Sequence, residues 1–134
     1  MSRYLIAYIA SGVVFFALDF AYLSLAGVSM FRHALGDWLA DPMRLGAGLL
    51  FYLVYFIGLI FFAVAPAFET QSLGTAVLRG AMLGLIAYTT YELTNYATLA
   101  RWNLTLVLVD TIWGIVVSAV AAGVGYRVAL WLGR

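Results

Sequence analysis

The chain has 134 residues, of which 66% are hydrophobic and only 10% are charged, and its formal net charge is +1. Soluble domains carry about a quarter charged residues, so this supply cannot build a water-facing surface. The near-neutral balance and the absence of a basic run exclude a nucleic-acid-binding surface. The chain contains no cysteine, which excludes disulfides, thiolate catalysis and sulfur-ligated metals. Composition therefore predicts an integral membrane protein.

Four apolar stretches are long enough to cross a bilayer, which takes about 20 residues in a helix. Backbone groups find no water in the hydrocarbon, so these stretches must be helices. In chain order the expected spans are 4–26, 44–65, 75–99 and 104–132. The first is interpreted as a retained helix, because no small-x-small cleavage site precedes a polar region. The sequence predicts an all-α bundle of four transmembrane helices that forms one domain, residues 1–134.

The connections between spans carry helix signals. Asp41-Pro42 suits the start of the second helix, with Asp as the cap and Pro in the first turn. Pro66 is expected to end that helix, and residues 101–103 form a tight turn between the third and fourth helices.

The segment 30–40, between the first two spans, has two interpretations. Phe31, Leu35, Trp38 and Leu39 share one helical face, which is typical of a short interfacial helix lying along the membrane surface. An ordinary loop with a Trp anchor explains the same residues equally well.

The arginines give the orientation of the bundle. Four spans place both termini at one face, and we call the opposite face, with the 27–43 connection and the Arg101 turn, the outer face. The terminal face has Arg3, Arg79, Arg127 and Arg134, and the outer face has Arg32, Arg44 and Arg101. The positive-inside rule therefore favours cytoplasmic termini by one arginine.

Two helices carry stripes of small residues at a spacing of four. The stripes are Ala76, Gly80 and Gly84 in the third span, and Gly114, Ser118 and Ala122 in the fourth. Small residues at this spacing let helix backbones approach closely. They mark a packing seam within the chain or with another copy, and a homo-oligomer is expected.

Three carboxylates, Asp19, Glu92 and Asp110, lie inside the expected spans. An acid inside a membrane costs several kcal/mol unless it is protonated, paired or hydrated, so it indicates a functional site. From the expected helix ends and a rise of about 1.5 Å per residue, all three should lie roughly 10 Å below the outer face.

Further polar and aromatic residues accompany the three acids. They are Tyr22, Tyr88, Tyr91, Asn95, Thr98, Trp102 and Trp113. Several share one face of the third helix, and a lipid-facing surface would not use such residues, so we expect them to face the bundle interior. Alternatively, Arg101, Arg32 or His33 pairs with the acids and forms a polar plug that fixes helix register.

Specific chemistry is weakly indicated. No metal site is expected, because His33 is the only histidine and no HxxxH or ExxH spacing occurs. No cofactor is expected either. Serine hydrolase chemistry lacks a buried His near a Ser. Paired carboxylates suit general acid–base catalysis, and a buried Glu92 or Asp110 also suits a proton carrier.

The run from residue 84 to residue 99, with Trp102, Asp110 and Trp113-Gly114, resembles the domain of unknown function 2177 family of small bacterial membrane proteins. The resemblance extends to Leu18-Asp19, Phe51-Tyr52, Tyr55 and Pro66, and so spans the chain. Glu92 and Tyr22 stand where the family pattern commonly has Asp and Trp, and both keep the chemical type. The resemblance implies a bacterial inner-membrane location, four helices and a shared motif on the third.

The sequence thus predicts a pocket in the outer half, lined by the three acids and the residues that accompany them. We expect it to bind or move a small molecule or a lipid, with the movement linked to protons. The alternatives are a lipid-modifying enzyme that uses paired carboxylates, and a non-catalytic partner of another membrane protein. The expected partners are the bilayer, such a ligand and a second copy of the chain, with no nucleic acid.

Overall fold

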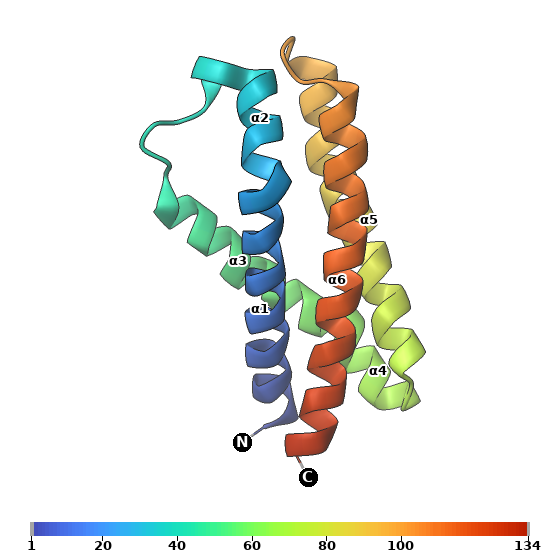
Figure 1. The fold of residues 1–134 in the computed structure, drawn as a ribbon. Helices are drawn as coiled ribbons and strands as arrows, with labels where there is room; N and C mark the ends of the chain where they lie inside the picture. The colour runs from blue at the N-terminus through green and yellow to red at the C-terminus, as the bar shows by residue number, and fades with distance from the viewer. Residues whose placement is uncertain (1, 134) are drawn as a thin grey trace.

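The computed structural model of the protein describes residues 2–133, and its helices form four rods (Figure 1). Each rod is long and apolar enough to cross a membrane, which confirms the predicted fold class. The rods are Arg3–Trp38, Leu45–Thr70, Leu73–Thr98 and Leu104–Leu132. Both chain ends lie at one end of the bundle in Figure 1, and the outer end lies opposite.

The first rod runs past its expected end. It consists of α1 (Arg3–Tyr22), a π-helical turn η1 (Leu23–Gly27) and α2 (Val28–Leu35), and a 3-10 turn η2 (Gly36–Trp38) follows. The expected interfacial helix is therefore joined to the first span, because the π turn keeps right-handed helical dihedrals on both sides. The rod ends at Gly36, whose φ of 53° is open to glycine.

The length of this rod has a consequence for its depth. At about 1.5 Å per residue, the continuous helix from Arg3 to Leu35 extends roughly 50 Å, well beyond a hydrocarbon core of about 30 Å. The outer part of the rod therefore projects beyond the core of the membrane.

The second rod contains α3 (Leu45–Leu59), a π-helical turn η3 (Ile60–Val64) and α4 (Ala65–Thr70). Its start lies within one residue of the predicted bound, but the helix signals predicted at Asp41-Pro42 and at Pro66 are both wrong. The Asp41-Pro42 bond is cis and α3 begins only at Leu45. Pro66 lies in the first turn of α4, directly after the π turn, where a missing N–H costs least.

The third and fourth rods are single helices, α5 (Leu73–Thr98) and α6 (Leu104–Leu132), close to their predicted bounds. Side chains cap both of them. Ser72 Oγ accepts a hydrogen bond from the backbone N–H of Thr75, and Asn103 Oδ1 accepts one from that of Leu106. These caps fix the two polar connections at which the chain reverses.

Helix α6 is the central element, and α5 and α1 pack against it. The second rod crosses them through η3 and then leans away, so α3 diverges from the bundle toward the outer end (Figure 1). Leu45 and Leu49, near the start of α3, are 74% and 57% exposed. In the outer half the bundle is therefore essentially a layer of α1/α2, α6 and α5.

The small-residue stripes of α5 and α6 pack against each other. A Cβ added to Gly80 would lie 2.7 Å from the carbonyl oxygen of Ser118, and one added to Gly84 would overlap that of Gly114. The two stripes thus pack against each other within one chain, so neither stripe is available for contact with a second copy.

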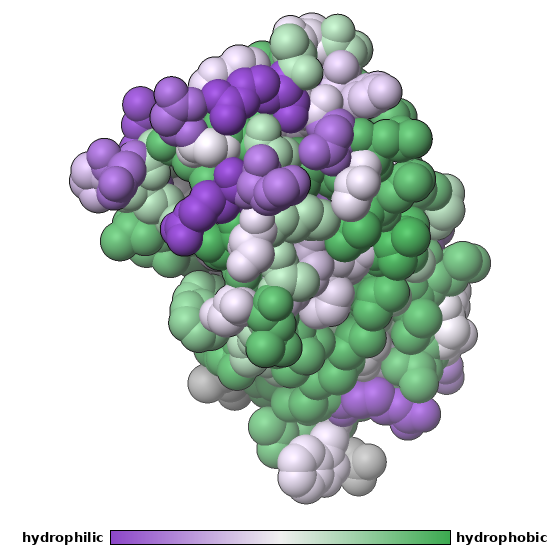
Figure 2. Space-filling view, turned by 45° about the horizontal axis from the view of Figure 1, so that its top comes forward, coloured by the Kyte–Doolittle hydropathy of each residue, from purple (hydrophilic) through white to green (hydrophobic). Residues whose placement is uncertain are grey.

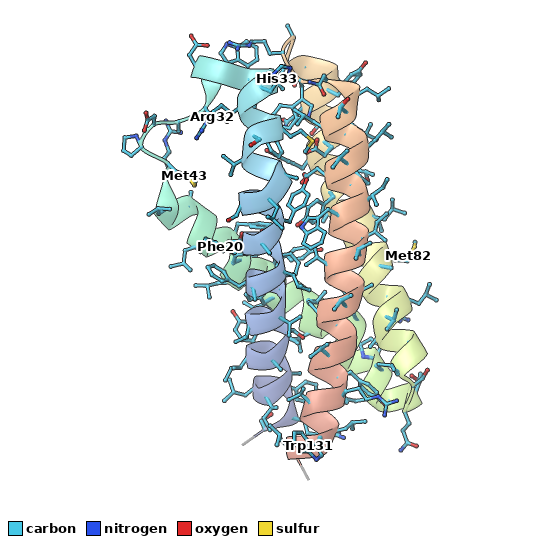
Figure 3. The ribbon with its side chains drawn as sticks, in the orientation of Figure 1. Phe20, Arg32, His33, Met43, Met82 and Trp131 are labelled. Carbon is cyan, nitrogen blue, oxygen red and sulfur yellow. The ribbon has the colours of Figure 1, made fainter. Side chains whose placement is uncertain are left out.

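The surface agrees with a membrane setting. Figure 2 shows hydrophilic residues gathered at the outer end and hydrophobic residues over the flank of the bundle. Phe20 and Met82, labelled in Figure 3, point outward from α1 and α5 and are 63% and 48% exposed. A flank of this kind is suited to lipid.

Candidate functional site

Three carboxyl groups from three helices are buried in the described chain. Asp19 on α1 is 8% exposed, Asp110 on α6 is 9% exposed, and Glu92 on α5 is fully buried. We call these residues the carboxyl cluster. Because an ionised carboxylate is costly to bury, each member requires hydrogen-bond donors, a cation or a proton.

Asp19 is held by donors from two other helices. The hydroxyl of Tyr52, on α3, donates to Oδ2 at 2.5 Å, and the indole Nε1 of Trp113, on α6, donates to Oδ1 at 2.8 Å. Each oxygen thus has its own donor. Asp19 ties α1 to both neighbours at the level where α3 crosses the bundle.

Asp110 is held from α1. The hydroxyl of Tyr22 donates to Asp110 Oδ1 at 3.2 Å. The ring of Tyr22 stacks on that of Trp113, with ring centroids 4.8 Å apart and an interplanar angle of 7°. Since Trp113 also donates to Asp19, one pair of aromatic rings links the two aspartates.

Glu92 has one donor and one free oxygen. The indole Nε1 of Trp102 donates to Oε1 at 2.9 Å, while no residue that the structure describes donates to the buried Oε2. The carboxyl group of Asp110 lies within hydrogen-bonding reach of that of Glu92. A carboxylate only accepts hydrogen bonds, so this contact can become a hydrogen bond only if one partner carries a proton.

The cluster extends along the bundle, and Asp19 lies farther from the end of its own rod than predicted. Asp19 stands 16 residues before Leu35, or roughly 24 Å from the outer end of its rod. Glu92 stands 6 residues before Thr98, and Asp110 stands 6 after Leu104, which is about 9 Å in each case. The prediction failed because it ended the first helix near residue 26.

The basic residues of the outer end do not reach the cluster. Arg101 forms the only ion pair found among residues 2–133, with Asp37 at 2.7 Å, and its guanidinium lies 4.9 Å from the ring centroid of Trp38. Arg32 and His33 are exposed on α2 at the outer end (Figure 3). The predicted plug with an arginine or histidine partner is therefore wrong, and Tyr and Trp donors take that place.

A comparison with protein families matches residues 4–127 to a family described as "Predicted membrane protein (DUF2177)". The chain belongs to this family. The match confirms the resemblance seen in the sequence and includes every member of the carboxyl cluster. The protein is thus a membrane protein with four candidate spans. No curated protein and no solved structure matches the chain.

Other residues predicted for the site of this DUF2177 protein lie at its margin. Tyr91 is 45% exposed, and its ring edge meets Trp102 at 5.5 Å between centroids. Tyr88 is half-buried, packs where a Cβ on Gly114 would collide with its ring, and approaches Tyr55 edge-on. Both rings border the carboxyl cluster without a hydrogen bond to it.

Thr98 and Asn95 take no part in the hydrogen-bond network. Thr98 is exposed and donates to the carbonyl of Thr94 in its own helix at 2.8 Å. Such back-bonding satisfies the hydroxyl, which is how α5 can present threonines to lipid. Asn95 is half-buried, and no hydrogen bond of its side chain is found within residues 2–133.

The site also contains residues that the prediction left out, Tyr52, Tyr55 and Ser118. Tyr52 holds Asp19, and the hydroxyls of Tyr55 and Ser118 lie 2.7 Å apart deeper in the bundle. Two tyrosines three residues apart on an otherwise apolar helix share one face, and this spacing was the available signal. It did not reveal the partner, since that depends on how the second rod crosses α1 and α6.

A surface depression lies beside the outermost member of the cluster. It has a volume of about 520 Å³ and is lined by residues 96–100 and Trp102. Trp102 is 7% exposed and its indole bonds Glu92, so this side chain separates the depression from the buried carboxyl. The described residues hold no group of three His, Cys, Asp or Glu side chains arranged for a metal ion.

Proposed function

We propose that the outer half of the bundle binds a small molecule or a lipid headgroup and moves it in a step linked to a proton on Glu92 and Asp110. The observation that supports this most is the charge balance of the carboxyl cluster. Three buried acids meet only Tyr and Trp donors, and no basic side chain among the described residues pairs with them.

A group of acids without a basic partner must be neutralised in another way. Two carboxylates in contact cannot both stay ionised in a site with little water, so the pair retains a proton. Glu92 and Asp110 form such a contact, in which a protonated Glu92 is suited to donate to Asp110. The pair acts as the proton carrier of the proposed step.

The polar groups also follow one another along the bundle. From Tyr52 and Asp19 near the middle, they continue through Trp113 and Tyr22 to Asp110 and end at Glu92 and Trp102. This series of polar groups leads toward the surface depression at the outer end of α5. In the proposed function the tyrosines orient the ligand and the tryptophans fix its depth.

The setting proposed for this step is the bacterial plasma membrane, with cytoplasmic termini and at least two copies of the chain. Four helices scarcely enclose a pathway, which is the reason for a second copy. The α5 and α6 stripes are occupied within the chain, so the copies would meet through another face. The molecular mass of the protein in detergent tests the number of copies. Reporters fused to either terminus test whether the termini are cytoplasmic.

The decisive experiment measures proton movement in proteoliposomes that hold an imposed pH gradient. Wild-type protein should dissipate the gradient, and Glu92→Gln and Asp110→Asn should each abolish the dissipation. Glu69→Gln is the matched control, because Glu69 is exposed at the end of α4, away from the cluster. If both cluster variants dissipate the gradient as the wild type does, these acids carry no proton and the proposal fails.

A further inference from the structure

The hydrogen bonds of the carboxyl cluster show which oxygens are available to a ligand. Both oxygens of Asp19, one of Asp110 and one of Glu92 already accept from Tyr or Trp. The oxygens left over are Oε2 of Glu92 and the second oxygen of Asp110. They belong to two carboxyl groups in contact, and the oxygen on Glu92 is fully buried without a donor.

We infer that the ligand of this site is an organic cation, an ammonium group on an apolar body, which takes the place of the proton between Glu92 and Asp110. This inference rests on the proposed function and names the chemical class of its ligand. An ammonium donates several hydrogen bonds and brings one positive charge. The free oxygens of Glu92 and Asp110 have neither a hydrogen-bond donor nor a compensating positive charge.

The surrounding side chains favour an organic cation over a bare metal ion. Metal ions in proteins take several oxygen ligands, whereas two oxygens are free here and no third acid or histidine in the described part of the chain is placed to join them. Aromatic rings attract cations through their faces. Tyr22, Tyr91, Trp102 and Trp113 surround the pair, and their rings offer an apolar body a surface to pack on.

The outer end offers an entry for such a ligand. The depression at residues 96–100 ends at Trp102, whose indole covers Glu92. A shift of this single side chain opens Glu92 to the depression. The ammonium would replace the indole N–H as the donor to Glu92, so the carboxyl keeps a partner throughout.

Other charged or titratable groups near the pair come from every element packed around it. Helix α1 contributes Asp19 and Tyr22, and α5 contributes Tyr88 and Tyr91. On α2, Arg32 and His33 point outward and are exposed. At the α5–α6 turn, Arg101 is engaged with Asp37. The positive groups are thus directed elsewhere, and the pair has no competing cation among residues 2–133.

The test is calorimetric titration of the purified full-length protein with phenethylammonium, in two buffers that differ in ionisation enthalpy. Binding should release close to one proton, because cation and proton occupy the same place. By linkage, the apparent affinity should then rise about tenfold per pH unit while the pair is protonated. Glu92→Gln should lose at least tenfold in affinity and all proton release, and Glu69→Gln should behave as wild type.

Several results would overturn the inference. These are no binding by the wild type between pH 5.5 and 8.5, binding without proton release, and equal affinity for uncharged phenethyl alcohol. Thermal unfolding of Glu92→Gln shows whether that variant is folded, and the pH dependence of the wild type needs no variant. If the wild type dissipates a pH gradient through Glu92 but does not bind the ammonium, the proposed function survives and only the ligand class is wrong.

Discussion

The two halves of this bundle are held together by different means. In the half near the termini, α5 and α6 meet through glycine, alanine and serine. There the backbones come so close that a methyl group on Gly84 would overlap the carbonyl oxygen of Gly114. In the outer half, Tyr and Trp side chains donate to buried acids across two helix contacts, α1–α6 and α1–α3, and the outer part of α3 leans away.

This difference separates scaffold from site. Close backbone packing leaves little room, and none of the three buried carboxyl groups lies there, so the half near the termini is suited to fixing helix positions. The outer half is held by side-chain hydrogen bonds, which can exchange partners with a ligand or a proton without unfolding the helices. Substitutions in the two halves should therefore differ in kind, and the following predictions test this, from the largest expected effect to the smallest.

Gly84→Ala should cause the largest loss of stability, about 3 kcal/mol, because overpacking against a backbone carbonyl forces α5 and α6 apart. Thermal unfolding in detergent measures the loss. Gly46→Ala is the control, since its added methyl meets nothing within 4 Å. Equal effects of the two variants would contradict the assignment of the small-residue stripes to each other.

Asp19→Leu should cost about 2 kcal/mol, because it leaves the Tyr52 hydroxyl and the Trp113 N–H without an acceptor. Removing a buried carboxyl offsets part of that cost. Asp19→Asn keeps one acceptor and should cost less than half as much in the same unfolding assay. A leucine variant as stable as the wild type would show that these donors do not depend on Asp19.

Ser118→Ala should cost about 1 kcal/mol, because the buried Tyr55 hydroxyl loses its partner at 2.7 Å. Denaturant titration by tryptophan fluorescence resolves a difference of this size. Thr98→Val serves as the comparison. The Thr98 hydroxyl is exposed and bonds only within its own helix, so no change beyond a few tenths of a kcal/mol is expected.

Asp37→Asn should have the smallest effect and leave the unfolding temperature unchanged. The side chain of Asp37 is 91% exposed, and solvent and salt screen its ion pair with Arg101. Unfolding at low and high salt checks this. A clear drop confined to low salt would show that the pair contributes to holding the outer end together.

Several features could be predicted because they depend on local chemistry alone. The four spans follow from apolar length. The tight turn at residues 101–103 lies where polar residues interrupt two apolar runs. Convergence of Asp19, Glu92 and Asp110 followed from the cost of exposing an acid to lipid. A pattern of residue types suffices for each of these.

Other features could not be predicted, and particular residues show why. Whether Pro66 ends a helix depends on the π turn just before it, and that turn leaves no pattern in the residue types. The depth of Asp19 was misjudged because residues 23–27 continue the first helix. Thr98 was predicted to face the bundle interior. The sequence alone cannot distinguish a threonine that bonds to its own helix backbone from one that faces a site.

By itself the sequence determined that this protein is four membrane helices with three acids that need partners. It did so because the bilayer imposes strict rules on length, backbone bonding and charge. Only the tertiary structure decided which side chains donate hydrogen bonds to these acids. Tyr and Trp from other helices and from the α5–α6 turn take the place of arginine, and Glu92 keeps one oxygen free. Such pairings depend on how helices cross, and that is a property of the whole bundle.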